Sequence, residues 1–278
     1  MTQAPLREII ARFELGARKS LGQHFLLDLN LTGRIARSAG ELAGVAVIEI
    51  GPGPGGLTRA LLESPAREVI AIERDHRCIA ALAELQDGAG GRLRIIEGDA
   101  LAIDAATLAE APRAIVANLP YNISTALLLR WLARIEDFES LTLMFQKEVA
   151  DRLAARPGTK AYGRLSVVSQ WRADVRPLFN LPARAFTPPP KVDSTVVRLT
   201  PRADFDAAPW SCFERVTAAA FGQRRKMLRA SLRSLGCAER LLEVTGLEPT
   251  ARAEEIDVSG FAALARALSD AETRPLPG

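Results

Sequence analysis

The stretch EIGPGPGGLT, residues 49–58, lies between an apolar strand-like run and a helix-like run, and it decides the fold. Gly51, Gly53 and Gly56 match the G-x-G-x-x-G spacing of a turn that holds a nucleotide between a strand and a helix. Glycine permits positive φ angles and carries no side chain, so a ligand can lie against the backbone. The stretch therefore predicts a nucleotide-binding turn in an α/β fold.

Strand-like runs alternate with helix-like runs on both sides of this turn. The expected strands cover residues 45–50, 68–74, 93–99, 113–120, 141–146, 171–179 and 194–200, and helical patterns cover 55–64, 75–86 and 124–135. This alternation indicates βαβ units and a Rossmann-like, mostly parallel sheet of seven strands with helices on both faces. The prolines of LPARAFTPPPK, residues 181–191, make the last connection irregular.

The pattern changes to helices alone in the C-terminal part, from about Cys212 to Ala267, with turns near Gly236 and Gly246. We therefore expect a catalytic, cofactor-binding domain at residues 1–202 and a small all-helical domain at 203–278. An amphipathic helix is expected at residues 5–16 of the first domain.

Composition narrows the class of protein. The net charge is only +3, so affinity for nucleic acid has to come from local clustering of basic residues. Cys78, Cys212 and Cys237 are scattered, and with His24 and His76 they form no metal-ligand spacing. No apolar run reaches the length of a membrane helix. We expect a cytoplasmic monomer without metal or membrane contact.

Acidic residues near the glycine turn indicate the kind of cofactor. Glu73 ends the second strand, where a carboxylate suits a ribose diol. Glu49, together with Pro52 and Pro54, favours a positively charged ligand such as S-adenosylmethionine over a pyrophosphate. Asp99 ends the third strand and is predicted to accept a hydrogen bond from the adenine amine of the cofactor, although it could instead cap the next helix. The turn by itself also fits a nicotinamide dehydrogenase.

The stretch NLPY, residues 118–121, ends the fourth strand at the same edge of the sheet and suits methylation of an exocyclic amine. The side-chain oxygen of Asn118 and the main-chain oxygen of Leu119 can accept the two amine hydrogens, and Pro120 fixes the turn. Tyr121 offers a flat surface for a base. The alternative is an ordinary strand-to-helix turn in which Asn118 caps and Tyr121 packs.

A basic cluster lies in FGQRRKMLRASLR, residues 221–233. On a helix, Arg225, Arg229 and Arg233 would share one face, which suits a phosphate backbone. Arg224 and Lys226 flank this face, and Arg18 and Lys19 could extend it. The alternative is a solvated face without a partner.

The sequence resembles the 16S ribosomal RNA adenine dimethyltransferase family over nearly its whole length. The shared stretches, in order, are KSLGQHFLLD, EIGPGPGGLT, IERD, GDAL, NLPYNIST, FQKEVADRL, KAYGRLSV, FTPPPKVDS and FGQRRKML. The resemblance implies a methyltransferase that uses S-adenosylmethionine. It also implies methylation of N6 of two adjacent adenines near the 3′ end of 16S rRNA, within the immature small ribosomal subunit, and a role in subunit maturation.

Site residues carry over from the resemblance by motif. It implies cofactor contacts at His24, Leu26, Gly51, Glu73, Asp99 and Asn118, and a base held between Tyr121 and Phe186. His24 is a departure, because several members of the family have Asn at this position. Core packing is the alternative role for Phe186.

Rival functions remain open on the sequence alone. A DNA adenine-N6 methyltransferase needs the same cofactor pocket and a similar amine-directed motif. From another class, the chain could act mainly as an assembly factor that docks on immature small subunits. A nicotinamide dehydrogenase is the third alternative.

Overall fold

The computed structural model describes residues 4–17 and 22–273. It divides into two compact units, of which the first comprises Met1–Ala150 with Arg176–Pro201 and the second comprises Asp151–Val175 with Arg202–Gly278. Residues 151–175 therefore belong with the C-terminal helices, whereas the sequence pattern places them in the first domain. Aromatic packing accounts for the difference, because Trp171 stacks on Phe213 at a ring-centroid distance of 3.7 Å.

A seven-stranded sheet forms the centre of the first unit, in the order β4-β3-β2-β5-β6-β9-β7. Strands β2 to β6 pair in parallel, and β9 runs antiparallel to β6. The prediction of a mostly parallel sheet of seven strands is confirmed. In chain order the strands are β2 (Ala46–Ile50), β3 (Glu68–Glu73), β4 (Leu93–Glu97), β5 (Arg113–Asn118), β6 (Ser140–Gln146), β7 (Ala173–Leu181) and β9 (Ser194–Pro201).

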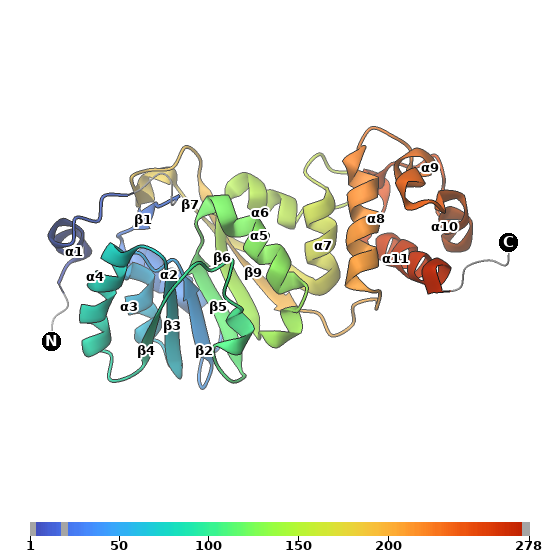
Figure 1. Cartoon of the computed structure of the whole chain (residues 1–278). Coiled ribbons are helices and arrows are strands. Elements are labelled where there is room, and N and C mark those ends of the chain that lie inside the picture. The colour runs from blue at the N-terminus through green and yellow to red at the C-terminus, as the bar shows by residue number, and fades with distance from the viewer. Residues whose placement is uncertain (1–3, 18–21, 274–278) are drawn as a thin grey trace. The chain divides into compact units, whose positions relative to one another are not determined.

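Four helices cover this sheet, and the last three of them connect parallel strands (Figure 1). They are α2 (Leu29–Ser38), α3 (Gly56–Leu62), α4 (His76–Asp87) and α5 (Tyr121–Leu132). Helices α3 and α4 contact β3, α4 also contacts β4, and α5 contacts β6. Every residue of β2 is buried, as expected for a parallel strand with helices packed on both faces of its sheet.

The N-terminal helix is shorter than the sequence suggests. Helix α1 covers Leu6–Arg12 instead of residues 5–16, and Glu14 adopts a positive φ of 50°. The chain leaves the helix because Leu15 turns inward and is 1 % exposed, in a cluster with Ile9 and Phe25.

A second, two-stranded sheet is absent from the sequence-based expectation. Strand β1 (Phe25–Leu26) pairs antiparallel with β8 (Phe186–Thr187), with Phe25 opposite Thr187. The irregular, proline-rich connection before β9 therefore lies beside the segment that precedes α2.

The second unit is helical, with α7 (Arg164–Arg172), α8 (Trp210–Gly222), α9 (Leu228–Ser231), α10 (Ala238–Thr245) and α11 (Val258–Thr273). Helix α6 (Lys147–Leu153) spans the boundary between the units. Short 3₁₀ turns complete the chain at η2 (Ala105–Thr107), η3 (Ile135–Asp137), η4 (Ala183–Ala185), η5 (Leu232–Leu235) and η6 (Ala253–Glu255). Among the described residues, none of the helices combines the length and apolarity needed to span a bilayer.

The predicted continuous helix through Arg225, Arg229 and Arg233 is wrong. Helix α8 ends at Gly222, and a turn separates it from α9. The reason is that the backbone N–H groups of Leu228 and Arg229 donate to the carbonyls of Ala251 and Pro249, at 2.8 and 3.1 Å, instead of to the preceding helical turn. The basic side chains therefore do not share one helix face.

Candidate active site

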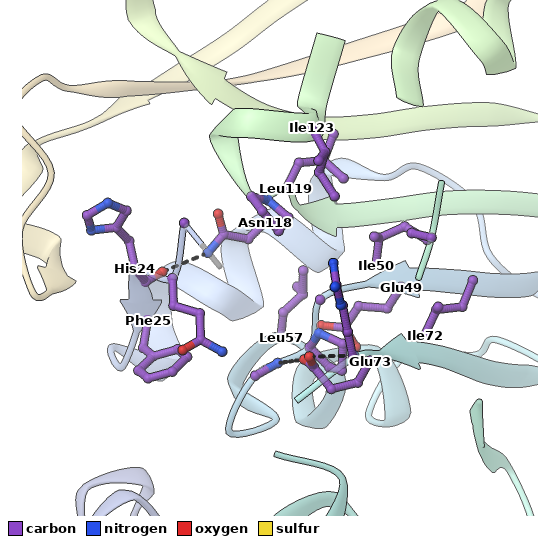
Figure 2. A pocket seen from close by; sticks show the side chains of 18 of the residues that line it. His24, Phe25, Glu49, Ile50, Leu57, Ile72, Glu73, Asn118, Leu119 and Ile123 are labelled. Carbon is purple, nitrogen blue, oxygen red and sulfur yellow. Dashed lines mark hydrogen bonds between the residues drawn. The ribbon is translucent and has the colours of Figure 1, made fainter. Parts of the chain in front are cut away.

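A cavity of about 170 Å³ opens at the carboxyl ends of β2, β3, β4 and β5 (Figure 2). This edge, where the strand order reverses beside β2, is the usual ligand site of doubly wound sheets. The cavity is lined by most of the predicted site residues, namely His24, Leu26, Gly51, Glu73, Asp99, Asn118, Leu119, Pro120 and Tyr121.

The glycine turn requires glycine at more than one position. Gly51 and Gly53 have φ angles of 65° and 55°. A Cβ atom on Gly53 would lie 3.0 Å from the Phe25 ring, and one on Gly56 would lie 2.8 Å from the Leu26 carbonyl oxygen. Larger residues would therefore push β1 away from the cavity.

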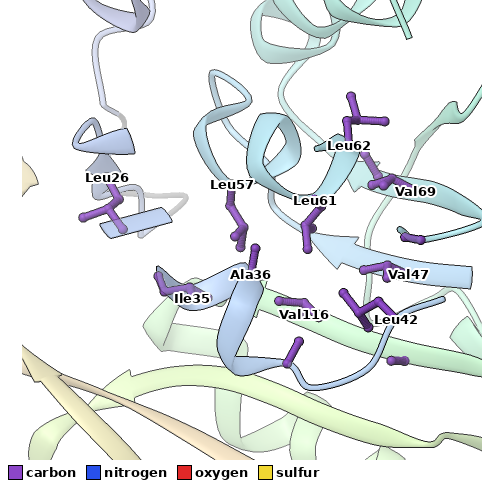
Figure 3. Packing of buried hydrophobic residues seen from close by; sticks show 14 of the residues in the cluster. Leu26, Ile35, Ala36, Leu42, Val47, Leu57, Leu61, Leu62, Val69 and Val116 are labelled. Carbon is purple, nitrogen blue, oxygen red and sulfur yellow. The ribbon is translucent and has the colours of Figure 1, made fainter. Parts of the chain in front are cut away.

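The packing beneath the turn fixes where α3 begins. Leu57 and Leu61 of α3 are buried against Val47 of β2, Val116 of β5 and Ile35 of α2 (Figure 3). This contact holds the first turn of α3 against the ends of the two strands that supply the cavity walls.

Glu73 ties the turn to the end of β3. Its Oε2 accepts the Gly53 N–H at 3.1 Å, and its Oε1 accepts the N–H groups of Arg74 and Asp75 at 2.7 and 2.8 Å. Burial raises the pKa of Glu73, and the three backbone bonds oppose that rise. A carboxylate oxygen has about two lone-pair sites, so Oε2 keeps one that can accept from a ligand hydroxyl.

Glu49 lies below the turn and is 1 % exposed. Among the described residues, neither its Oε2 nor the Thr58 hydroxyl makes a hydrogen bond of normal geometry, although the Thr58 side chain lies close enough to act on this carboxyl. Burial raises the pKa of Glu49 to about 8; the Thr58 side chain opposes this rise, and the charge of Glu73 adds to it. At neutral pH the side chain is therefore mostly protonated, and a nearby cation would favour its ionised form.

Asp75 and Arg77 form a clamp on the N-terminal segment that sequence reasoning missed. Arg77 contacts the Asp75 carboxylate at 2.7 Å and donates to the Glu14 carbonyl oxygen at 2.7 Å, while Gln23 donates to Asp75 at 3.1 Å. The Arg77 hydrogen bond is the largest cause that lowers the pKa of Asp75 to about 2. The clamp holds Gln23 next to the cavity. Its one signal in the sequence is Asp75, the last residue of the IERD stretch.

Asn118 and Tyr121 stand at the end of β5 and the start of α5. Asn118 Nδ2 donates to the main-chain oxygen of His24 at 3.3 Å, which leaves Oδ1 at the other end of the amide as an acceptor (Figure 2). The Tyr121 hydroxyl lies 2.7 Å from Ser194 Oγ, and burial raises the pKa of Tyr121.

Asp99 lines the cavity and also has partners in the protein. Its Oδ1 accepts the Leu101 N–H at 2.9 Å, and its Oδ2 contacts Arg74 at 3.2 Å. Asp99 therefore caps a turn and not the next helix, because the following helical segment, η2, is capped by Asp104. A cofactor contact would have to share the Asp99 carboxylate.

Phe186 is buried in the core and does not face the cavity. It is 2 % exposed, packs in the main hydrophobic core and is not among the residues that line the cavity. In this conformation Tyr121 presents its ring to the cavity and Phe186 does not.

The basic residues differ in their surroundings. Arg224 donates to Glu254 at 2.8 Å and to the Lys160 carbonyl oxygen at 2.8 Å. Arg224 is exposed, as are the other four, Arg225, Lys226, Arg229 and Arg233. Arg18 and Lys19 lie outside the described residues.

The fold and the site define a Rossmann-like methyltransferase. Its marks are the antiparallel β9 inserted at one end of a parallel sheet, the glycine turn held by Glu73, and an Asn-Leu-Pro-Tyr turn at the end of β5. The family model described as ribosomal RNA adenine dimethylase matches residues 15–270, and the chain belongs to that family.

Relatives and solved structures agree with this assignment. Ribosomal RNA small subunit methyltransferase A of Paramagnetospirillum magneticum is 69% identical, with 97% of this chain and 96% of the relative covered. The protein of the same name from Rhodospirillum rubrum is 66% identical, with 96% and 93% covered.

Two solved structures are similar over most of the chain. A dimethyladenosine transferase from Plasmodium falciparum has a TM-score of 0.77 at 28% identity, covering 87% of this chain and 96% of its own. The 23S rRNA methyltransferase ErmE has a TM-score of 0.67 at 27% identity, covering 88% and 99%.

Glu49→Gln should remove a pH dependence from the stability of the protein. Because burial raises the pKa of Glu49 from 4.5 to about 8, the folded state keeps a proton that the unfolded state loses, and stability falls as pH rises between these values. Relative to Glu49→Gln, the unfolding free energy of the wild type should fall by up to about 1.4 kcal/mol per pH unit and level off above that range. Urea denaturation at a series of pH values measures it.

The matched control is Glu63→Gln, which removes one exposed carboxyl from the C-cap position of α3. Because this side chain is exposed, Glu63→Gln should keep the fall in stability that Glu49→Gln removes. If Glu49→Gln also kept this fall, the buried carboxyl would not hold its proton in this range.

Proposed function

We propose that the protein transfers methyl groups from S-adenosylmethionine to N6 of two adjacent adenines near the 3′ end of 16S rRNA, in an immature small ribosomal subunit in the cytoplasm, and so takes part in subunit maturation. The observation that carries the proposal is that one cavity joins a ribose-type acceptor, Glu73, to the amine-directed turn at Asn118–Tyr121. Membership of the ribosomal RNA adenine dimethylase family supports the reaction class.

The acidic groups of the cavity fit this cofactor better than a dinucleotide. S-adenosylmethionine supplies an electrophilic methyl group on a positively charged sulfur and carries an ammonium group. Glu73 Oε2 retains an acceptor site for a ribose hydroxyl, and the buried Oε2 of Glu49 makes no hydrogen bond of normal geometry among the described residues. A pyrophosphate would oppose the ionisation of the two buried carboxyls beside the turn, whereas a cationic ligand favours it, and this weighs against the dehydrogenase alternative.

Asn118 and Leu119 prepare the amine for attack. The nitrogen lone pair of an exocyclic amine is delocalised into the ring, so the nitrogen must become more tetrahedral before it can attack carbon. Oxygen acceptors for its two hydrogens, Asn118 Oδ1 and Leu119 O, favour that geometry. The rest of catalysis is alignment, because the methylated nitrogen is a cationic acid that can release its proton to water.

Tyr121 holds the base during the transfer. Stacking of a base on an aromatic ring contributes about 1–3 kcal/mol, comparable with the cost of taking a base out of its stack. The Tyr121 hydroxyl contact to Ser194 fixes the ring at the rim of the cavity.

After the first methyl transfer one N–H remains on the amine, so one oxygen acceptor suffices for the second transfer.

The direct test is transfer of a labelled methyl group to immature small subunits that lack the modification, with mature subunits, free rRNA and DNA in parallel. Label should enter the rRNA of the immature subunits and require S-adenosylmethionine. Incorporation into DNA would instead favour the DNA-directed alternative, and no incorporation into any substrate would contradict the proposal.

Asn118→Ala separates catalysis from docking in the same assay. It should lower methyl transfer about 10²- to 10³-fold, the usual cost of removing one oriented polar group at a reacting centre. Binding to the immature subunit should be unchanged. Full methylation by this variant would remove Asn118 from the chemistry.

Replacing both Arg225 and Lys226 with Glu should weaken RNA binding and reduce its salt dependence. Both side chains are exposed, and loss of two phosphate contacts lowers the slope of log affinity against log salt by about 2. Filter binding to the subunit at several salt concentrations measures the slope, and cofactor affinity should not change. The charge-matched control replaces the exposed Arg7 and Arg37 of the first unit with Glu. Equal losses in the two double variants would show an effect of net charge alone.

A further inference from the structure

The His24 side chain is directed away from the cofactor end of the cavity. Its main-chain oxygen accepts the Asn118 amide, but its imidazole lies on the other side of the backbone, away from Glu49 and Glu73 (Figure 2). The ring stacks on Tyr121, with centroids 5.6 Å apart and an angle of 28° between the planes.

A second contact fixes the orientation of this imidazole. His24 Nδ1 lies 2.8 Å from the main-chain oxygen of Pro188. A carbonyl oxygen only accepts, so Nδ1 carries a hydrogen and donates it. One hydrogen bond and one stacking contact together hold the ring.

The pairing of β1 with β8 brings these groups together. Phe25 lies opposite Thr187, so His24, which precedes β1, lies beside Pro188, which follows β8. Tyr121 is fixed independently through its hydroxyl by Ser194, whose side chain is fully buried at the start of β9. The residue before β1, the first residue of α5 and the connection from β8 to β9 therefore meet at the two stacked rings.

We propose that His24 is a positioning residue for the target base, which acts by stacking on one face of Tyr121 and holding that ring in place to receive the base on its other face. The proposal rests on the proposed function, in which Tyr121 binds the adenine. It gives the His24 side chain a role at the base end of the site, distinct from the cofactor contact that the family resemblance implies for this position.

The stack can be tested without any activity measurement. The chain has only two tyrosines, Tyr121 and Tyr162, so ring-labelled tyrosine gives two sets of NMR signals that Tyr121→Phe assigns. His24→Ala should shift the Tyr121 ring signals, because the ring current of the imidazole is lost, and leave those of Tyr162 unchanged. Unshifted Tyr121 signals would overturn the proposal whatever the protein methylates.

The role in catalysis is tested by kinetics on the RNA substrate that the wild type methylates. His24→Ala should lower kcat/KM for RNA about three- to tenfold, the range of an aromatic stacking contact, with cofactor Kd unchanged. In the Tyr121→Ala background the same change should have little further effect, because the two rings act as a unit. Additive losses, or a weaker cofactor Kd with normal kcat/KM for RNA, would overturn it.

Two further variants separate the ring from other causes. His24→Phe keeps a ring but loses the bond to Pro188, and it should recover most of the kcat/KM for RNA. His76→Ala removes the only other histidine, an exposed side chain paired with Glu97, and it should behave as the wild type. Failure of His24→Phe to recover any activity would argue against stacking as the cause.

Discussion

One buried carboxylate, Glu73, connects the parts on which the site depends. Burying a charge without partners is costly, and the N–H groups of Gly53, Arg74 and Asp75 together offset that cost. In return, the carboxylate holds the glycine turn after β2 against the end of β3. Without it, three backbone donors at the edge of the sheet would lose their acceptor, at about 1–3 kcal/mol for each one left buried. One wall of the cavity depends on this side chain, together with the packing of Leu57 and Leu61 that holds the start of α3.

Much of the fold was predictable because the local pattern and the final structure agree. The parallel strands β2, β3, β5 and β6 are mostly buried on both faces, so they appear in sequence as short apolar runs, and the ends of β2, β3 and β5 carry the polar residues that face the cavity. Contacts between distant segments were not predictable in this way. β1 and β8 have two residues each and no periodicity. Trp171 joins the helical unit by stacking on Phe213, which is distant from it in sequence. The turn after Gly222 depends on backbone carbonyl acceptors at residues 249–251, which the basic run does not contain. The basic run by itself therefore predicts a helix.

The candidate site likewise has a part that the sequence predicts and a part that it does not. The positions of Glu73, Asn118 and Tyr121 follow from where strands end, and sequence reasoning placed them together. The protonation of Glu49 depends on burial, which spacing does not reveal. The His24 contact with Pro188 joins residues 164 positions apart, and the Asp75–Arg77 clamp reaches back to Glu14. The burial of the Phe186 ring in the core could not be inferred from its motif, and its contact with a base stays a prediction.

The central claim is that the cavity aligns a methyl donor with the amine-directed turn at the end of β5. A crystal structure of the protein with bound S-adenosylmethionine tests it most directly. The account predicts ribose hydroxyls on the Glu73 carboxylate and the methyl carbon directed at the space between Asn118 Oδ1 and the Tyr121 ring. A cofactor bound elsewhere, or one whose methyl group points away from Tyr121, would contradict it.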